Sequence, residues 1–255
     1  MLLHTYHYGS PSDPALVILH GFLGSADNWA TLARKWSERF FVLAPDARNH
    51  GRSPHANEFD HPSMVRDVLE LLTRHHLKRA HLLGHSMGGR TAMELALMHP
   101  ELVHRLIVVD IGSKRYRSHH DVILDALQSV DLTIAKSRAD VDAVLARSIS
   151  EHSIRQFLMK NLQRTDEGAF RWKMNLPVLV RDYDRILEGL APGRTFGGPT
   201  LLVRGSRSSY VPDADLPGIR QFFPAVRIES LDAGHWVHVE RPEELSSLVL
   251  DFLSP

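Results

Sequence analysis

Short apolar runs alternate along this chain with segments whose apolar residues recur at helical spacing. Runs at 15–20, 41–45, 80–84 and 106–110 are almost continuously apolar, and strand-like patterns return at 199–205 and 226–231. Helical spacing is found at 64–76, 87–99 and 242–253. Nearly continuous apolar strands separated by helices are typical of a parallel sheet that is buried on both faces. The pattern therefore predicts an α/β fold with a mostly parallel sheet flanked by helices.

The pattern changes between residues 113 and 191, where it predicts helices and no convincing strand. Helical spacing appears there in four segments: 121–130, 138–149, 153–162 and 176–190. No repeat or linker divides the chain into independent halves. We therefore expect one α/β core, formed by residues 1–112 and 192–255, that is interrupted by a helical cap insert at 113–191.

Composition narrows the possible partners of the protein. Thirty Lys and Arg residues balance thirty Asp and Glu residues, so the formal net charge is zero. This balance argues against nucleic acid or an anionic membrane as a partner. Cysteine is absent, which excludes disulfides, thiol catalysis and Cys-ligated zinc. We expect no membrane span and no signal peptide, and therefore a cytoplasmic protein.

The high histidine content raises the question of a metal site. The chain contains 17 His, but two of the obvious pairs, His75-His76 and His119-His120, are adjacent in sequence. Neighbours in sequence do not share a helix face, and no H-E-x-x-H spacing occurs. We therefore expect neither a metal nor another cofactor.

One motif indicates a catalytic serine. Residues 84–88 read Gly-His-Ser-Met-Gly, which fits the G-x-S-x-G pattern between a predicted strand and a predicted helix. Flanking glycines let neighbouring chain approach a tight strand-to-helix turn, and the helix directs its positive N-terminal end toward developing negative charge. The motif predicts that Ser86 is a nucleophile, whereas the alternative is a glycine-rich turn without catalytic function.

A serine nucleophile needs a base that takes its proton. His235 lies after a predicted strand and before the last predicted helix, preceded by Gly234. A histidine late in the chain fits the order nucleophile, acid, histidine that α/β hydrolases use. We therefore predict His235 as the base, with His238 as the competing candidate.

Several motifs together give the chain a family resemblance. They are His20-Gly21-Phe22-Leu23-Gly24, the run from Asp46 to Ser53, Gly84 to Gly89, Gly234-His235, and the run from Phe170 to Pro177. These motifs resemble the α/β-hydrolase superfamily and, within it, the bacterial YbfF-type esterases and their mitochondrial abhydrolase relatives. The resemblance extends over nearly the whole chain and implies the α/β-hydrolase fold and a serine esterase of the EC 3.1 type.

The acid of the site is harder to assign. In most superfamily members it follows the strand after the insert in a G-x-x-D pattern, but here Ser208 occupies that slot. In YbfF-type esterases the acid follows the strand after the nucleophile helix, which matches Asp110. A carboxylate at the C-terminal end of a parallel strand is well placed to reach the site. Asp110 is therefore favoured over Asp213, Asp215 and Asp232.

An acyl-transfer site also needs donors for the oxyanion. One is expected at the backbone N–H of Met87, which follows the nucleophile, and the resemblance places the second at the N–H of Phe22. We interpret Arg48, Asn49 and Gly51 as structural, because buried turns need satisfied polar groups. The default role of Trp29, Trp172 and Trp236 is packing, with lining of an acyl pocket as the alternative.

The predicted reaction is hydrolysis of a small acyl ester or thioester, possibly an acyl-CoA, through an acyl-serine intermediate. Serine C–C hydrolases and lyases of the same fold remain an alternative. A non-catalytic receptor that binds a small ligand is an alternative of another class. The sequence leaves the acyl group, the leaving group and the oligomeric state open.

Overall fold

A computed structural model describes residues 1–254. Its main sheet contains the strands in the order β1 (Thr5–Tyr8), β3 (Phe41–Pro45), β2 (Ala15–Leu19), β4 (Ala80–His85), β5 (Val103–Val109), β8 (Thr200–Gly205) and β9 (Val226–Leu231). Among the strands of this sheet within residues 1–254, only β1 runs antiparallel to its neighbour, and the other neighbours pair in parallel. The predicted α/β-hydrolase fold is confirmed. The sequence pattern missed β1, because this half-exposed edge strand has no apolar run.

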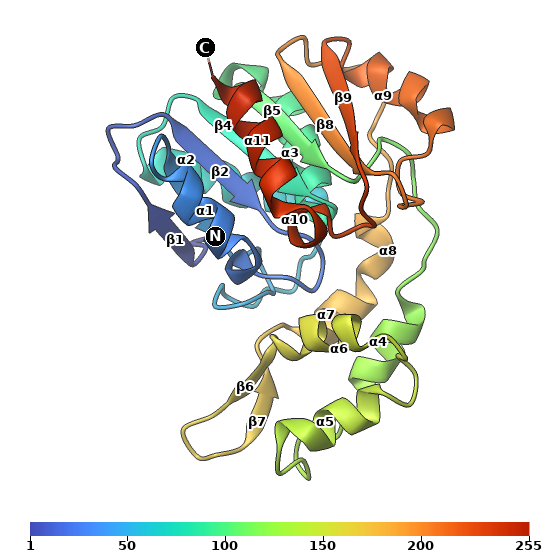
Figure 1. Ribbon diagram of the computed structural model, residues 1–255. Coiled ribbons are helices and arrows are strands. Elements are labelled where there is room, and N and C mark those ends of the chain that lie inside the picture. Colours follow the sequence, from blue (N-terminus) through green and yellow to red (C-terminus); the bar gives the residue numbers. More distant parts are fainter. Residues whose placement is uncertain (255) are drawn as a thin grey trace.

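Helices cover both faces of the sheet (Figure 1). One face packs against α1 (Ala30–Trp36), which follows the short helix η1 (Ala26–Trp29), and against α10 (Val237–Glu240) and α11 (Pro242–Leu253). The other face packs against α2 (His61–Arg74), α3 (Met87–Met98) and α9 (Leu216–Phe222), whereas the 3-10 turns η2 (Pro100–Leu102) and η3 (Asp213–Asp215) lie in connections. Successive strand residues point to opposite faces, so Leu82 and Leu83 enter different clusters. This two-sided burial explains why the strands lack polar alternation.

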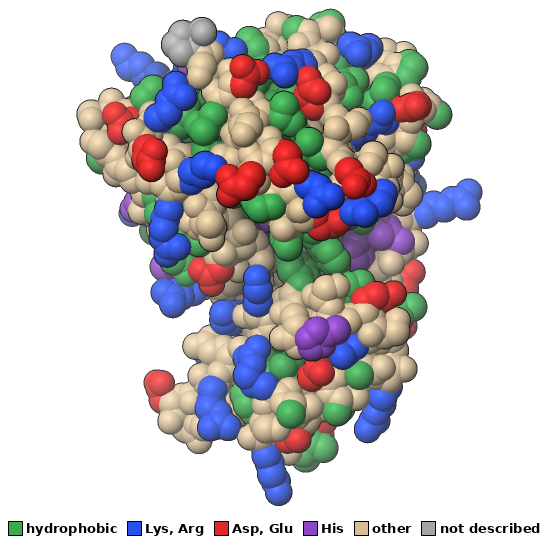
Figure 2. Space-filling view, in the orientation of Figure 1, with side chains coloured by type: hydrophobic (Ala, Val, Ile, Leu, Met, Phe, Trp, Pro, Cys, Tyr) green, Lys and Arg blue, Asp and Glu red, His purple; other side chains and the backbone are tan. Residues whose placement is uncertain are grey.

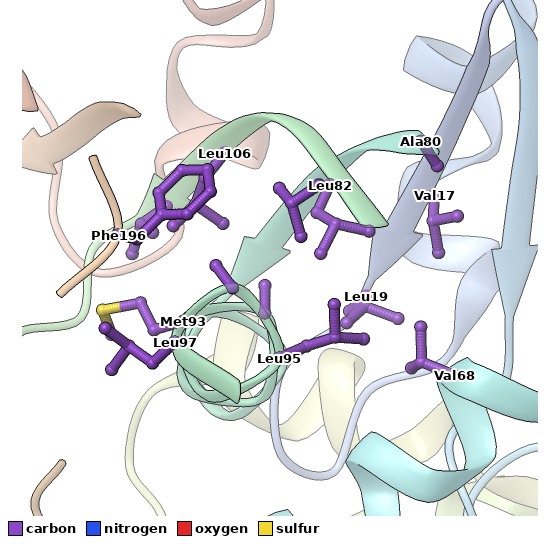
Figure 3. Close-up of a cluster of buried hydrophobic side chains, with 14 of the residues drawn as sticks. Val17, Leu19, Val68, Ala80, Leu82, Met93, Leu95, Leu97, Leu106 and Phe196 are labelled. Atoms are coloured by element: carbon purple, nitrogen blue, oxygen red, sulfur yellow. The ribbon is translucent and has the colours of Figure 1, made fainter. Parts of the chain in front are cut away.

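Helix α3 is central to the packing that holds Ser86 in place. Figure 3 shows Met93 and Leu97 of this helix below Leu106 and Phe196. Ala92 and Ala96 are fully buried, and their small side chains let the helix lie close to the sheet. The nucleophile turn at the start of α3 is therefore fixed by the core itself.

The chain between β5 and β8 folds outside the sheet. It contains α4 (Asp121–Gln128), α5 (Arg138–Leu145), α6 (His152–Met159), α7 (Leu176–Arg181), α8 (Tyr183–Ile186) and a hairpin of β6 (Leu162–Arg164) and β7 (Phe170–Trp172). The prediction that residues 113–191 hold helices alone was wrong, because strands of three residues are too short to show an alternating pattern. The predicted helix 176–190 is also divided, at Asp182. We propose that residues 113–191 act as a cap.

The two segments that connect the cap to the core lie side by side. Tyr116 N donates to Leu187 O at 2.9 Å, and Leu190 N donates to Ser113 O at 2.9 Å. The guanidinium of Arg90 in α3 donates to backbone carbonyls of both segments, at Gly112, Ser113, Lys114 and Glu188. Burial lowers the pKa of Arg90 to about 10, so the group stays charged at neutral pH. One buried side chain thus joins both connections to the core.

No helix within residues 1–254 combines the length and the apolar character needed to cross a bilayer.

Candidate active site

Ser86 lies at the sharp turn between β4 and α3. Its φ of 52° and ψ of −119° are unusual for a residue with a side chain. The turn is held by hydrogen bonds from Ser86 N to Val109 O at 3.0 Å and from Arg90 N to Ser86 O at 2.9 Å. A Cβ at Gly84 would overlap the carbonyl of Gly88. The motif glycines are therefore required by the close approach of backbone, and the turn presents the serine hydroxyl away from the sheet.

The structure brings Ser86, His235 and Asp110 together. His235 Nε2 lies 3.0 Å from Ser86 Oγ, and His235 Nδ1 lies 2.8 Å from Asp110 Oδ2. Asp110 follows the end of β5 and is completely buried, whereas the side chain of His235 is 20% exposed. This arrangement lets the ring accept the serine proton on one nitrogen while the carboxylate orients the other. The catalytic roles of the three residues stay predictions that this geometry supports.

The buried carboxylate of Asp110 has further hydrogen-bond donors. Gly205 N donates to Oδ1 at 2.9 Å, and the Ser208 hydroxyl donates to Oδ2, the same oxygen that His235 contacts. Ser208 occupies the slot in which many relatives of the fold carry their acid. Sequence reasoning noted the slot but did not foresee that its serine would contact Asp110.

We expect Ser208→Ala to lower kcat by about ten- to a hundredfold, since a hydrogen bond to a charged group contributes about 1.5–3 kcal/mol. KM should change little, because Ser208 lines neither cavity beside Ser86. Steady-state rates on a p-nitrophenyl ester measure the effect. Ser206→Ala is the matched control, because Ser206 is exposed. Wild-type turnover in Ser208→Ala would show that Asp110 does not need this donor.

The rival acids have other partners. Asp213 pairs with Arg204 at 2.6 Å, Asp215 pairs with Lys114 at 2.6 Å, and Asp232 pairs with Arg241 at 3.2 Å. Within residues 1–254 none of the three is hydrogen-bonded to His235. The structure therefore favours Asp110 among the acids that the sequence left open.

The competing histidine makes no hydrogen bond to Ser86 within residues 1–254, although it lines the same cavity. His238 is 7% exposed and stacks on Trp29, with ring centroids 4.5 Å apart. Burial lowers the pKa of His238 to about 3, so its ring is neutral at physiological pH. This position makes His238 part of the packing around Trp29, which also contacts Trp36.

Within residues 1–254 no three His, Asp or Glu side chains are grouped to hold a metal ion.

The position of His235 depends on neighbours that sequence reasoning missed. The ring of Tyr210 stacks on His235, with centroids 3.7 Å apart and planes at 11°. Tyr116 Oη donates to Tyr210 O at 2.7 Å and thereby fixes that segment. On the other side, His85 Nε2 lies 2.9 Å from His235 O. The signal for His85 was its place in the serine motif, whereas nothing in the sequence marked Tyr210.

Two backbone donors lie beside the nucleophile, as the oxyanion prediction requires. Phe22 and Met87 adjoin Ser86 along a cavity wall. Within residues 1–254 neither N–H donates a hydrogen bond to another protein group. Buried polar groups are rarely left unpaired, so two free donors at one serine fit a site for a developing oxyanion. Their role in the reaction stays a prediction.

The loop from Asp46 to Ser53 is held in place by polar contacts. Arg48 forms a bidentate ion pair with Asp67, at 2.7 Å and 2.9 Å. Asn49 Oδ1 accepts from Ala56 N at 2.8 Å, and Gly51 lies against the Asp46 carboxylate. These contacts agree with the structural interpretation of the loop.

Two cavities meet at Ser86. The first chamber, of about 40 Å³, is lined by residues that include Trp29, Ile154, Phe157, His235 and Trp236. The second chamber, of about 30 Å³, is lined by residues that include Met87, Ile111, Ile186, Leu187 and Tyr210. Both share Phe22, Ser86 and His120. Trp29 and Trp236 therefore line the site, whereas Trp172 lies on the β6–β7 hairpin.

Comparison with known proteins places this geometry in a family. A sn-1-specific diacylglycerol lipase, ABHD11, of Mus musculus is 38% identical over 96% of this chain and 83% of its own length. The chain belongs to the α/β-hydrolase family. The family model described as alpha/beta hydrolase fold matches residues 14–132 of this α/β hydrolase.

Other relatives of this α/β hydrolase are named as esterases. Esterase YbfF of Escherichia coli (strain K12) is 31% identical and covers 97% of this chain, which spans 94% of YbfF. A solved structure titled marine microorganism esterase is 36% identical, with a TM-score of 0.96, and covers 99% of this chain and 100% of its own. The predicted resemblance to YbfF-type esterases and abhydrolase relatives is confirmed.

Proposed function

We propose that this α/β hydrolase cleaves small carboxylic esters and thioesters through an acyl-Ser86 intermediate. The observation that carries the proposal is the hydrogen-bonded series Ser86, His235 and Asp110 beside two free backbone donors. Relatives named as esterases and lipases support a serine hydrolase of the carboxylic ester class. Such a site needs no group other than these residues and water to complete the reaction.

The first half of the reaction transfers the acyl group to the enzyme. His235 Nε2 takes the proton of Ser86 Oγ as that oxygen attacks the carbonyl carbon. The carbonyl oxygen becomes an oxyanion, which accepts hydrogen bonds from the N–H groups of Phe22 and Met87. Asp110 stabilises the imidazolium. When the intermediate collapses, His235 returns the proton to the departing alcohol or thiol, and water then repeats the sequence to release the acid.

The two chambers differ in their lining residues, and this difference decides which part of the substrate each would hold. His235 lines the first chamber but not the second. The leaving group must receive its proton from His235, so it belongs in the first chamber. The acyl chain then occupies the second chamber, whose walls include Ile111, Ile186 and Leu187. Because the second chamber is small, we propose a preference for short acyl chains.

This assignment makes a matched pair of variants informative. Leu187→Ala should enlarge the second chamber and raise kcat/KM for p-nitrophenyl hexanoate relative to the acetate by about tenfold, since one methylene in an apolar pocket contributes about 1–3 kcal/mol. Phe157→Ala should instead favour bulky leaving groups, such as benzyl over methyl esters, without changing acyl preference. The reverse pattern would show that the two chambers are assigned the wrong way round.

A labelling experiment tests the function itself. A fluorophosphonate probe should attach to Ser86 in the wild type and to no residue in Ser86→Ala, because only an activated serine reacts with the probe. The labelled protein should lose its p-nitrophenyl esterase activity. A non-catalytic receptor would stay unlabelled. A C–C hydrolase would be labelled but would prefer a vinylogous diketone to the esters.

The substrate class can be narrowed by comparing leaving groups. Oxygen esters and acyl-CoA thioesters present the same carbonyl carbon to Ser86, so the mechanism accommodates both. Rates on acyl-CoA and p-nitrophenyl esters of matched chain length would decide between them. The diacylglycerol named for the mouse relative is much larger than either chamber. Hydrolysis of diacylglycerol by this chain would therefore require the cap to move.

A further inference from the structure

A second cleft lies between the core and the cap, and its walls share no residue with either chamber. It has a volume of about 640 Å³ and is formed by the loop at residues 51–55 and the β6–β7 hairpin. Its lining includes the side chains of Arg52, His55, Gln163, Arg171, Trp172 and Lys173. We call these residues the basic cleft. Figure 2 shows Lys and Arg side chains on both sides of the indentation between the upper and lower parts of the molecule.

The charge of the basic cleft is unbalanced. Arg52, Arg171 and Lys173 form no ion pair with any carboxylate of residues 1–254, and no carboxylate lines the cleft. Asp46 lies behind the turn, but it is buried and already accepts from the backbone N–H groups of Ala26 and Arg52. In a chain whose charges otherwise cancel, this concave surface is positive.

The two walls of the basic cleft are connected by hydrogen bonds. His55 Nε2 lies 3.0 Å from Lys173 O, and Asn175 N donates to Asn49 O at 2.9 Å. Lys173 N also donates to Asn161 O at 2.8 Å, which fixes the base of the hairpin. The cleft therefore exists before any ligand arrives, and the cost of ordering it on binding is small.

The side chains of the basic cleft indicate the chemistry of its ligand. Arg and Lys side chains are the usual protein donors to phosphate oxygens. Trp172 adds a large, partly exposed aromatic ring, on which a planar base can stack. We propose that the basic cleft binds a nucleoside phosphate. Ordinary solvated surface cations would not explain a concave cleft that combines three unpaired cations with a tryptophan.

Titration of the intact protein with ADP tests this proposal, by calorimetry and by the change in its total tryptophan fluorescence, to which Trp172 of the cleft contributes. ADP should bind saturably, inorganic pyrophosphate more weakly and adenosine not at all, and the affinity should fall as salt is added. Arg171→Ala and Lys173→Ala should each weaken ADP binding about tenfold, as expected for the loss of a charged hydrogen bond. Lys78→Ala, at an exposed lysine outside the cleft, should leave the affinity unchanged.

Three results would overturn the proposal. The first is absence of ADP and pyrophosphate binding at millimolar concentrations, and the second is unchanged affinity in both cleft variants. The third is binding of phosphatidate vesicles in the absence of ADP binding, which would indicate a lipid surface as the partner. Because the readout is binding, it is independent of the proposed esterase. The cleft variants should hydrolyse p-nitrophenyl acetate at the wild-type rate, which also shows that they are folded.

Discussion

The Asp110→Asn variant is expected to lose about four orders of magnitude in kcat while it remains folded. An amide at this position offers His235 no negative charge, so the imidazolium that forms in the transition state is no longer stabilised. It also favours the wrong tautomer of the ring. The fold should tolerate the change, because asparagine matches aspartate in shape and readily adopts the positive φ of 50° found at this position.

Steady-state kinetics of Asp110→Asn measure the loss of kcat, and thermal unfolding shows whether the variant remains folded. Asp213→Asn is the control, because Asp213 is exposed and pairs with Arg204. That control should keep wild-type turnover. If Asp110→Asn were nearly fully active and Asp213→Asn inactive, Asp110 would not be the acid of the site.

The protein is expected to lose stability steeply between pH 7 and pH 5.5. Burial is the largest cause that lowers the pKa of His50, His61, His120 and His238 to about 3 each. In the unfolded chain these histidines bind protons below about pH 6.5, whereas in the folded protein they stay neutral. Stability is therefore complete above pH 6.5 and falls as the pH approaches 3. At pH 5.5 the loss is about 1.4 kcal/mol for each histidine, which together is comparable to the stability of many domains.

Urea unfolding at a series of pH values measures this loss. The His238→Phe variant provides a matched comparison, because phenylalanine can keep the stack on Trp29 but cannot bind a proton. The variant should lose about 1.4 kcal/mol less than the wild type between pH 7 and pH 5.5. An unfolding free energy that stays constant down to pH 5 would show that the buried histidines do not govern acid stability.

The sequence predicted the parts of the molecule that depend on local pattern. The long apolar strands and the Gly-x-Ser-x-Gly turn carry their own signals, because the period of burial and the tight turn restrict which residues fit. Asp110 and His235 were placed by chain order and by the resemblance, and the structure brings both to Ser86. The turn that holds Ser86 could therefore be predicted from residues 84–88 alone, whereas Asp110 and His235 needed the wider comparison.

Features that depend on distant contacts were not predicted. Tyr210 stacks on His235 and Ser208 donates to Asp110 only because β8, β9 and β5 are neighbours in the sheet. The β6–β7 hairpin escaped notice because each of its strands has three residues. Such contacts are produced by tertiary packing and leave no period in the sequence.

The way Arg90 joins both cap connections to α3 restricts how the proposed cap could move. The side of the cap at residues 112–114 and 188 is held to α3, and the hairpin side is held by the hydrogen bond from Asn175 N to Asn49 O at 2.9 Å. We therefore expect the largest displacement at α6, where Phe157 meets Trp236 with ring centroids 5.6 Å apart and lines the first chamber. In the proposed reaction, this margin is where the alcohol would leave and the attacking water would enter.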